Sequence, residues 1–121
     1  MSTVGFLLLK NSPDFDEQEL LKAVKGFHYD IPSEEKHKIK LRHFNSTNKN
    51  IYRGFFPFLD NDISHKEFYD LGRPYDQQDP VERETYPMYE PTPWVNDPEG
   101  KHTWIIETLD KYFKKMFDVA T

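Results

Sequence analysis

A run of prolines between Gly72 and Gly100 restricts the fold of this chain more than any other feature of its sequence. Each proline lacks a backbone N–H and disfavours helix at the residue before it, so neither a long helix nor a central strand can be sustained there. The prolines are Pro74, Pro80, Pro87, Pro91, Pro93 and Pro98. We therefore predict a long irregular segment that is anchored by large side chains. Those side chains are Tyr86, Met88, Tyr89 and Trp94.

Three other segments have the composition of short strands. Residues 4–10 (VGFLLLK) form a near-continuous apolar run that ends in a turn signal, which predicts a buried strand. Residues 51–59 (IYRGFFPFL) are the most aromatic segment, and Pro57 restricts them to an edge or irregular strand. Residues 63–71 fit a strand or a short helix, and periodicity does not decide between the two.

A first helix is predicted after the early strand. Asp14 or Asp16 can cap its N-terminus. One apolar face at helical spacing would consist of Leu20, Leu21, Val24 and Phe27. Gly26 weakens the end of this helix, and Pro32 prevents its simple continuation.

A short charged segment, residues 34–42, follows the first helix. We expect Ser33 to cap it and Ile39 to be its inward-facing side chain. Residues 45–50 (NSTNKN) are polar throughout and predict a loop.

The clearest helix lies at the end of the sequence, where apolar positions recur at helical spacing and form a broad face. These positions are Trp104, Ile105, Thr108, Leu109, Tyr112, Phe113, Met116 and Phe117. Lys111, Lys114 and Lys115 lie on the opposite side. No glycine or proline stop signal follows, so we expect this helix to be cut off at Thr121 rather than finished. The expected fold class is α+β, with short strands and two or three helices.

Composition limits the function classes. The chain has 121 residues, enough for one domain, and 16% aromatic residues supply a core despite the low overall hydrophobicity. A net charge of −5 without a basic block argues against nucleic-acid binding, which depends on neutralising phosphates. The absence of cysteine excludes disulfides and thiolate metal sites. The apolar run at residues 6–9 is too short for a signal peptide or a membrane span, so we expect a cytoplasmic protein that does not bind membranes.

Histidines offer two candidate metal sets. An open non-haem iron site needs two histidines and one carboxylate on one face of the metal. His28 and Asp30 are two residues apart where a helix ends, so their side chains should not face the same ion. His65, Glu67 and His102 form the second set and leave a small metal enzyme as an alternative, although surface histidines are expected instead. No serine lies in a G-x-S-x-G motif, so no nucleophile is predicted either.

Five segments, in order along the chain, resemble the N-terminal region of the iron(II)/2-oxoglutarate-dependent oxygenases related to isopenicillin N synthase. They are VGFLLLKN (4–11), LLKAVKGFHYDIPSEEKHKI (20–39), YRGFFP (52–57), SHKEFYDLG (64–72) and residues 96–116. The resemblance implies the N-terminal portion of a double-stranded β-helix oxygenase without its catalytic barrel. Residues 1–121 would then be a single, incomplete non-haem dioxygenase N-terminal domain.

In that family the His-x-Asp motif, the distal histidine and the Arg-x-Ser motif for 2-oxoglutarate lie in the barrel. None of the four arginines of this chain is followed by x-Ser. The resemblance therefore implies no catalytic or metal-binding residue here, and a chain that is inactive alone. Iron(II) and 2-oxoglutarate would belong to the complete enzyme, and the partner would be the missing barrel or another protein.

One binding role is implied by the resemblance. The segment that contains Tyr52, Arg53 and Phe56 borders the substrate pocket in related enzymes, where Arg53 would meet an acidic group of the substrate. The residues alone favour a different arrangement, in which Phe55, Phe56 and Phe58 are core and Arg53 is solvated. A further alternative for the whole chain is a free-standing interaction module that contacts its partner through exposed aromatic side chains.

Overall fold

The structure is a computed structural model that describes residues 16–72, 80–85 and 88–120. The predicted strand at residues 4–10, the possible cap Asp14 and the anchor Tyr86 lie outside the described residues. The order of elements is α1 (Glu17–Lys25), η1 (Gly26–Asp30), α2 (Ser33–Lys38), β1 (Gly54–Phe56), β2 (Phe68–Asp70), α3 (Pro80–Thr85) and α4 (Thr103–Ala120). The predicted α+β class is confirmed.

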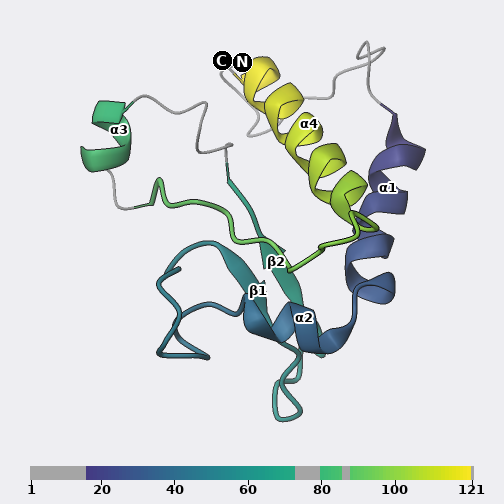
Figure 1. The fold of residues 1–121 in the computed structure, drawn as a ribbon, viewed down its shortest axis with the longest axis vertical. Helices are drawn as coiled ribbons and strands as arrows, with labels where there is room; N and C mark the ends of the chain where they lie inside the picture. The colour runs from purple at the N-terminus through teal and green to yellow at the C-terminus, as the bar shows by residue number, and fades with distance from the viewer. Residues whose placement is uncertain (1–15, 73–79, 86–87, 121) are drawn as a thin grey trace, which may run out of the picture.

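Helices α1 and α4 pack side by side (Figure 1). The carboxylate of Asp16 accepts the backbone N–H of Glu19 at 3.0 Å, which confirms Asp16 as the cap of α1. Helix α4 lies so close that a Cβ on Gly26 would stand 3.0 Å from Cδ1 of Ile105. A glycine at this position therefore permits the close approach of the two helices.

The predicted apolar face of α1 is only half correct. Leu21 and Val24 are 43% and 39% exposed, whereas Ala23 and Phe27 are buried and Leu20 is partly buried. Residues 20, 23 and 27 lie on one stripe of the helix, which is covered by α4 and the rest of the apolar cluster. Leu21 and Val24 lie on the neighbouring stripe, which no described element covers to the same extent.

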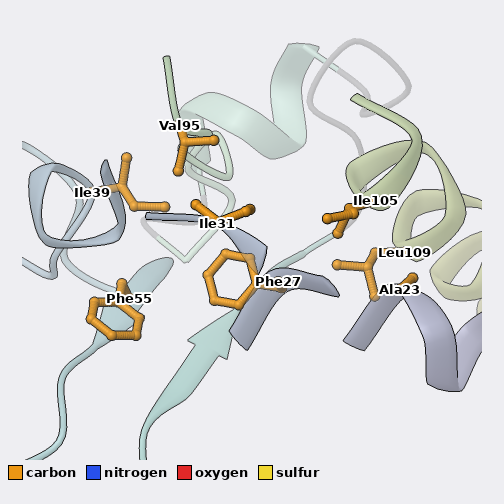
Figure 2. Close-up of a cluster of buried hydrophobic side chains, with 8 residues drawn as sticks. All are labelled: Ala23, Phe27, Ile31, Ile39, Phe55, Val95, Ile105 and Leu109. Atoms are coloured by element: carbon orange, nitrogen blue, oxygen red, sulfur yellow. The ribbon is translucent and has the colours of Figure 1, made fainter. Parts of the chain in front are cut away.

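One apolar cluster joins helices, sheet and irregular segment (Figure 2). Its members are Ala23, Phe27, Ile31, Ile39, Phe55, Val95, Ile105 and Leu109. Phe27 is at its centre and stacks on Tyr69 with a distance of 4.3 Å between ring centroids. Ile39 is buried as predicted. Ile105 and Leu109 are the buried residues of α4, while Phe117 at its far end is 40% exposed.

Helix α2 begins one residue earlier than predicted. Ser33 is the first helical residue, and Pro32 takes the capping position without a side-chain hydrogen bond. The carbonyl of Pro32 accepts the N–H groups of Glu35 and Lys36 and so starts the helix. The prediction that Ser33 caps this helix is wrong, because the fixed φ of Pro32 already sets the entry into the first turn.

Strands β1 and β2 form a short antiparallel pair in the register Gly54↔Asp70, Phe55↔Tyr69 and Phe56↔Phe68. Strand β1 ends directly before Pro57, and the ambiguous segment 63–71 contains a strand. On its other side β1 meets Lys40 in a parallel bridge at Phe55.

Residues 88–95, which we call the strap, connect α3 to the core. The hydroxyl of Tyr69 donates to the carbonyl oxygen of Pro93 at 2.7 Å, and the N–H of Gly72 donates to Oγ1 of Thr92 at 2.9 Å. Trp94 packs against the core as predicted, but Met88 is 53% exposed and is not an anchor. The buried anchor that the sequence did not reveal is Val95. No helix among the described residues is both long and apolar enough to span a membrane.

Candidate functional site

The three residues predicted to border a substrate pocket lie on β1 and the turn before it, but they do not converge. Phe56 stands in an aromatic row with Phe44 and Phe68, at centroid distances of 4.7 and 5.2 Å. Tyr52 is 37% exposed. Arg53 is half-buried and turned the other way, with Nη2 donating to the carbonyl oxygen of Met88 at 3.1 Å.

The alternative prediction, in which the phenylalanines of this segment are core and Arg53 is solvated, is also only partly confirmed. Phe55 is core, as expected, but Phe58 is 46% exposed. The guanidinium of Arg53 is not free in solvent, because its atoms pass close to Gly72, where a Cβ would lie 2.5 Å from Nε. Arg53 therefore belongs to the junction between β1 and the strap.

Glu90 is the residue of this region that the sequence did not reveal. Its carboxylate accepts three consecutive backbone N–H groups, those of Ile51 at 2.9 Å, Tyr52, and Arg53 at 2.6 Å. The strap therefore fixes the turn that carries Tyr52 and Arg53. Glu90 lies in a proline-rich stretch without periodicity, so no pattern in the sequence pairs it with residues 51–53.

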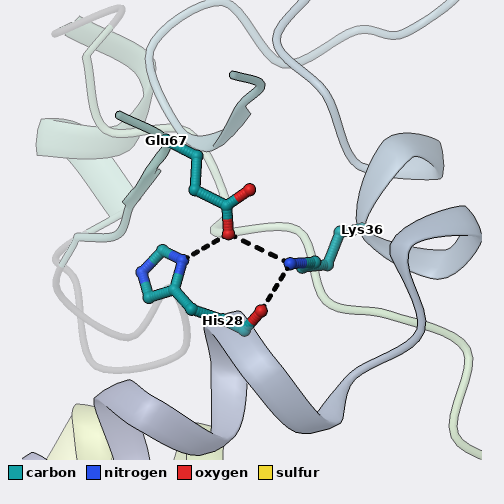
Figure 3. A network of polar contacts seen from close by, with 3 residues as sticks. All are labelled: His28, Lys36 and Glu67. Carbon is teal, nitrogen blue, oxygen red and sulfur yellow. Dashed lines mark hydrogen bonds and ion pairs between the residues drawn. The ribbon is translucent and has the colours of Figure 1, made fainter. Parts of the chain in front are cut away.

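A second polar cluster joins η1, α2 and the residue before β2 (Figure 3). Oε1 of Glu67 accepts from Nδ1 of His28 at 2.6 Å and from Nζ of Lys36 at 3.0 Å. Nζ of Lys36 also donates to the carbonyl oxygen of His28 at 2.9 Å. Lys36 is only 5% exposed and lies over the ring of Phe55. A buried ammonium requires such partners, because desolvation of an unpaired charge is costly.

The surroundings of Glu67 favour its charged form. Partial burial opposes ionisation, but hydrogen bonds from His28 and Lys36, together with the charge of Lys36, hold the pKa of the Glu67 carboxyl below its usual value. Lys36 was not predicted to be buried, since its neighbours in the sequence are charged and solvated. The cluster can therefore cross-link three segments, and its chemistry is that of a structural ion pair.

The structure separates both candidate metal sets. His28 faces Glu67, while Asp30 is exposed. His65 stacks on Phe58 with a centroid distance of 5.7 Å. Within the described ranges, no three His, Cys, Asp or Glu side chains form a group that could hold a metal ion. The residues described here therefore do not fit an iron site.

Next to His102, the carboxylate of Asp97 holds the start of α4. It accepts the N–H groups of Lys101 at 3.0 Å and His102 at 2.7 Å, and the hydroxyl of Thr103 at 3.2 Å. Desolvation opposes ionisation, but these hydrogen bonds, first that from the His102 N–H, lower the pKa of Asp97. His102 thus belongs to a helix cap.

Besides a hollow of about 320 Å³ that is lined by Leu21, Tyr29, Asp30 and their neighbours, two further hollows on the surface lie away from Tyr52, Arg53 and Phe56. One, of about 260 Å³, lies between α1 and α4 and has Leu20 and Thr108 on its walls, with Lys111 and Glu19 at its edge. The other, of about 160 Å³, is lined by Ile31, Val95 and their neighbours. The first is rimmed by paired opposite charges, since Lys111 and Glu19 are 3.5 Å apart. Neither hollow brings together residues predicted to be functional.

Comparison with known proteins gives one informative similarity. The chain is 23% identical over 117 residues to isopenicillin N synthase of Streptomyces jumonjinensis. The match includes 97% of this chain and 35% of that enzyme, so the chain spans about a third of the length of its curated relative. No family model matches the chain, and no solved structure matches it. The similarity is weak and partial, and it suggests a region related to the oxygenase superfamily.

Proposed function

We propose that this chain is the N-terminal supporting region of an iron(II)/2-oxoglutarate-dependent oxygenase and carries neither the iron site nor the 2-oxoglutarate site. The observation that carries the proposal is the distribution of the similarity to isopenicillin N synthase, which is continuous along 97% of this chain but confined to 35% of the enzyme. A supporting region within a larger enzyme would give this distribution. Residues 1–121 would then be one incomplete domain, with a catalytic barrel as its partner.

The fold is compatible with a supporting role. Helix α4 and the two-stranded sheet share one apolar cluster, so the sheet and the strap have fixed positions relative to the long helix. Glu90 of the strap accepts the backbone N–H of Tyr52, and the strap thereby holds the turn that carries Tyr52. In the proposed enzyme, Tyr52 and Phe56 border the substrate, because Tyr52 is directed outward and Phe56 is only partly covered.

The role of Arg53 in this proposal differs from the substrate contact that the resemblance implies. Its guanidinium donates to the carbonyl oxygen of Met88 and lies against Gly72, so it would contact an acidic substrate group only after leaving these partners. We propose that Arg53 holds the strap in place through its hydrogen bond to Met88 and thereby stabilises the turn that carries Tyr52.

The test compares the 121-residue chain with a longer product of the same gene, if the reading frame continues after the codon of Thr121. The expected continuation encodes His-x-Asp, a distal histidine and Arg-x-Ser. The longer product should bind one equivalent of iron(II) in calorimetry and form succinate from 2-oxoglutarate, whereas the chain alone should do neither. The proposal fails if the chain alone binds one ferrous ion and loses it in His65→Ala.

A free-standing interaction module is the second candidate, and the exposed apolar side chains favour it. Ile63 is 95% exposed, Tyr29 is 82% exposed, and Phe58 is 46% exposed. Gel filtration and thermal melting separate the two candidates. An interaction module should be monomeric with a steep melting transition, whereas a supporting region should associate through uncovered apolar surface and melt over a broad range.

A further inference from the structure

The backbone of residues 51–53, which surrounds the carboxylate of Glu90, has the form of an anion-binding site. Three consecutive N–H groups, those of residues 51–53, converge on the two oxygens of one carboxylate. Successive amides in a tight turn form a concave site with partial positive charge, which favours an anion over a neutral group. The side chain that occupies the site is itself an oxyanion, which identifies the chemistry that the site accepts.

The turn has a second brace besides Glu90. Nδ2 of Asn50 donates to the carbonyl oxygen of Arg53 at 2.6 Å and to that of Lys40 at 3.1 Å. The first of these hydrogen bonds closes the turn from inside, and the second ties it to the chain beside β1. Neither of these hydrogen bonds needs the carboxylate of Glu90, so both can keep the three amides convergent when it is withdrawn, and a preorganised site binds its ligand at lower entropic cost.

The site lies at an open surface. The guanidinium of Arg53 is directed away from it, toward Gly72 and the carbonyl oxygen of Met88, so the three backbone N–H groups alone bind the carboxylate. Ile51 is 53% exposed and Tyr52 is 37% exposed, so the amides lie near solvent rather than in the core. Glu90 arrives from the strap, 37 to 39 positions later in the sequence.

We propose that the amides of residues 51–53 form a binding site for a small carboxylate, which Glu90 occupies as an internal competitor. An external carboxylate enters only when the Glu90 side chain is removed or displaced. The site needs no metal and no 2-oxoglutarate, so its test is independent of the proposed oxygenase function.

The test is an NMR titration of the 121-residue chain with sodium acetate, with sodium chloride as the control for ionic strength. In Glu90→Ala the amide resonances of residues 51–53 should shift saturably with acetate and not with chloride. The unchanged chain and the matched variant Glu84→Ala, which removes an exposed carboxylate of α3, should not respond at neutral pH. The additional change Asn50→Ala should weaken the acetate response of Glu90→Ala, because it removes the brace of the turn.

Two results overturn the proposal. One is a Glu90→Ala chain that is folded, as judged by circular dichroism, but whose amide resonances at residues 51–53 do not shift with acetate. If that variant does not fold, Glu90→Gln decides, because its neutral amide oxygen keeps the strap in place but competes poorly with an anion. Acetate should then shift the same three amides in Glu90→Gln, and the absence of that shift equally overturns the proposal.

Discussion

The ammonium group of Lys36 lies 3.0 Å from the carboxylate of Glu67, 31 positions later in the sequence, and is almost completely buried. The same ammonium donates to the carbonyl oxygen of His28, while Glu67 also accepts from the ring of His28. One carboxylate and one ammonium thus connect η1, α2 and the start of β2. This connection lies directly beside Phe27 and Phe55 of the apolar cluster and adds a polar link between the sheet and the helices.

Replacing Lys36 by methionine should destabilise the chain. The change removes one of the two partners of the Glu67 carboxylate, and it removes the ammonium that donates to the carbonyl oxygen of His28, so the expected loss is about 2 kcal/mol. Urea denaturation followed by tryptophan fluorescence measures it. The control is Lys38→Met, which removes the exposed pair with Glu35 and should change the midpoint little. Equal midpoints for the two variants would contradict a special role of Lys36.

The Glu67 carboxyl should make the free energy of unfolding depend on pH. Its pKa is below the usual value of 4.5 in the folded chain, so the stability it contributes is fully present above pH 4.5 and is lost as the pH falls through the lower folded value. Glu67→Gln should therefore differ most from the unchanged chain at neutral pH, and the difference should shrink below pH 4.5. Urea midpoints across this range test the sign, and a difference that grows on acidification would refute it.

The sequence was informative where one local signal decides the structure. The apolar periodicity of α4, the cap Asp16 and the break at Pro57 are local features, and the structure has all three. Ile39 was likewise recognised as the inward residue of a charged segment. The cap and the proline break depend on interactions within a few residues, and Ile39 is the clearest apolar residue of a charged segment, so the sequence could indicate these features without its tertiary contacts.

Features that depend on distant partners were not predictable. Which apolar stripe of α1 is buried depends on the position of α4, so helical periodicity alone wrongly predicts that Leu21 is buried. The burial of Lys36 depends on Glu67, and the role of Glu90 depends on the path of the strap. A role for Tyr52, Arg53 and Phe56 is implied by the resemblance alone, and their contact with a substrate stays a prediction.

Gly54 should tolerate no side chain. Its φ of +130° is strained for other residues, and a Cβ would lie 2.5 Å from the carbonyl oxygen of Ile39. Gly54→Ala should cost about 3 kcal/mol or prevent folding, since strain and steric overlap act together. Gly100→Ala is the control, because it has a positive φ of 69° but open space, with Oγ1 of Thr103 3.9 Å away. Its cost should be about 1 kcal/mol, from strain alone. Similar thermal midpoints for both variants would show that the overlap at Gly54 is relieved.

Tyr69 should reveal how firmly the strap is held. Tyr69→Phe removes the hydrogen bond to the carbonyl oxygen of Pro93 and should cost about 1 kcal/mol at neutral pH. Burial, with a smaller contribution from the charge of Asp110, raises the pKa of the Tyr69 hydroxyl above its usual value of 10.0. The unfolded chain therefore ionises first, and the stability linked to the neutral phenol is lost as the pH rises above 10.

The difference between Tyr69→Phe and the unchanged chain should consequently narrow or change sign in alkali. The matched control is Tyr29→Phe, which alters a side chain that is 82% exposed and should follow the unchanged chain at every pH. Urea midpoints between neutral pH and pH 11 give the comparison. If Tyr69→Phe and Tyr29→Phe behave alike across this range, the hydroxyl of Tyr69 does not hold the strap, and the position of Trp94 and Val95 must depend on apolar packing and on the other hydrogen bonds of the strap, those of Thr92 and Glu90.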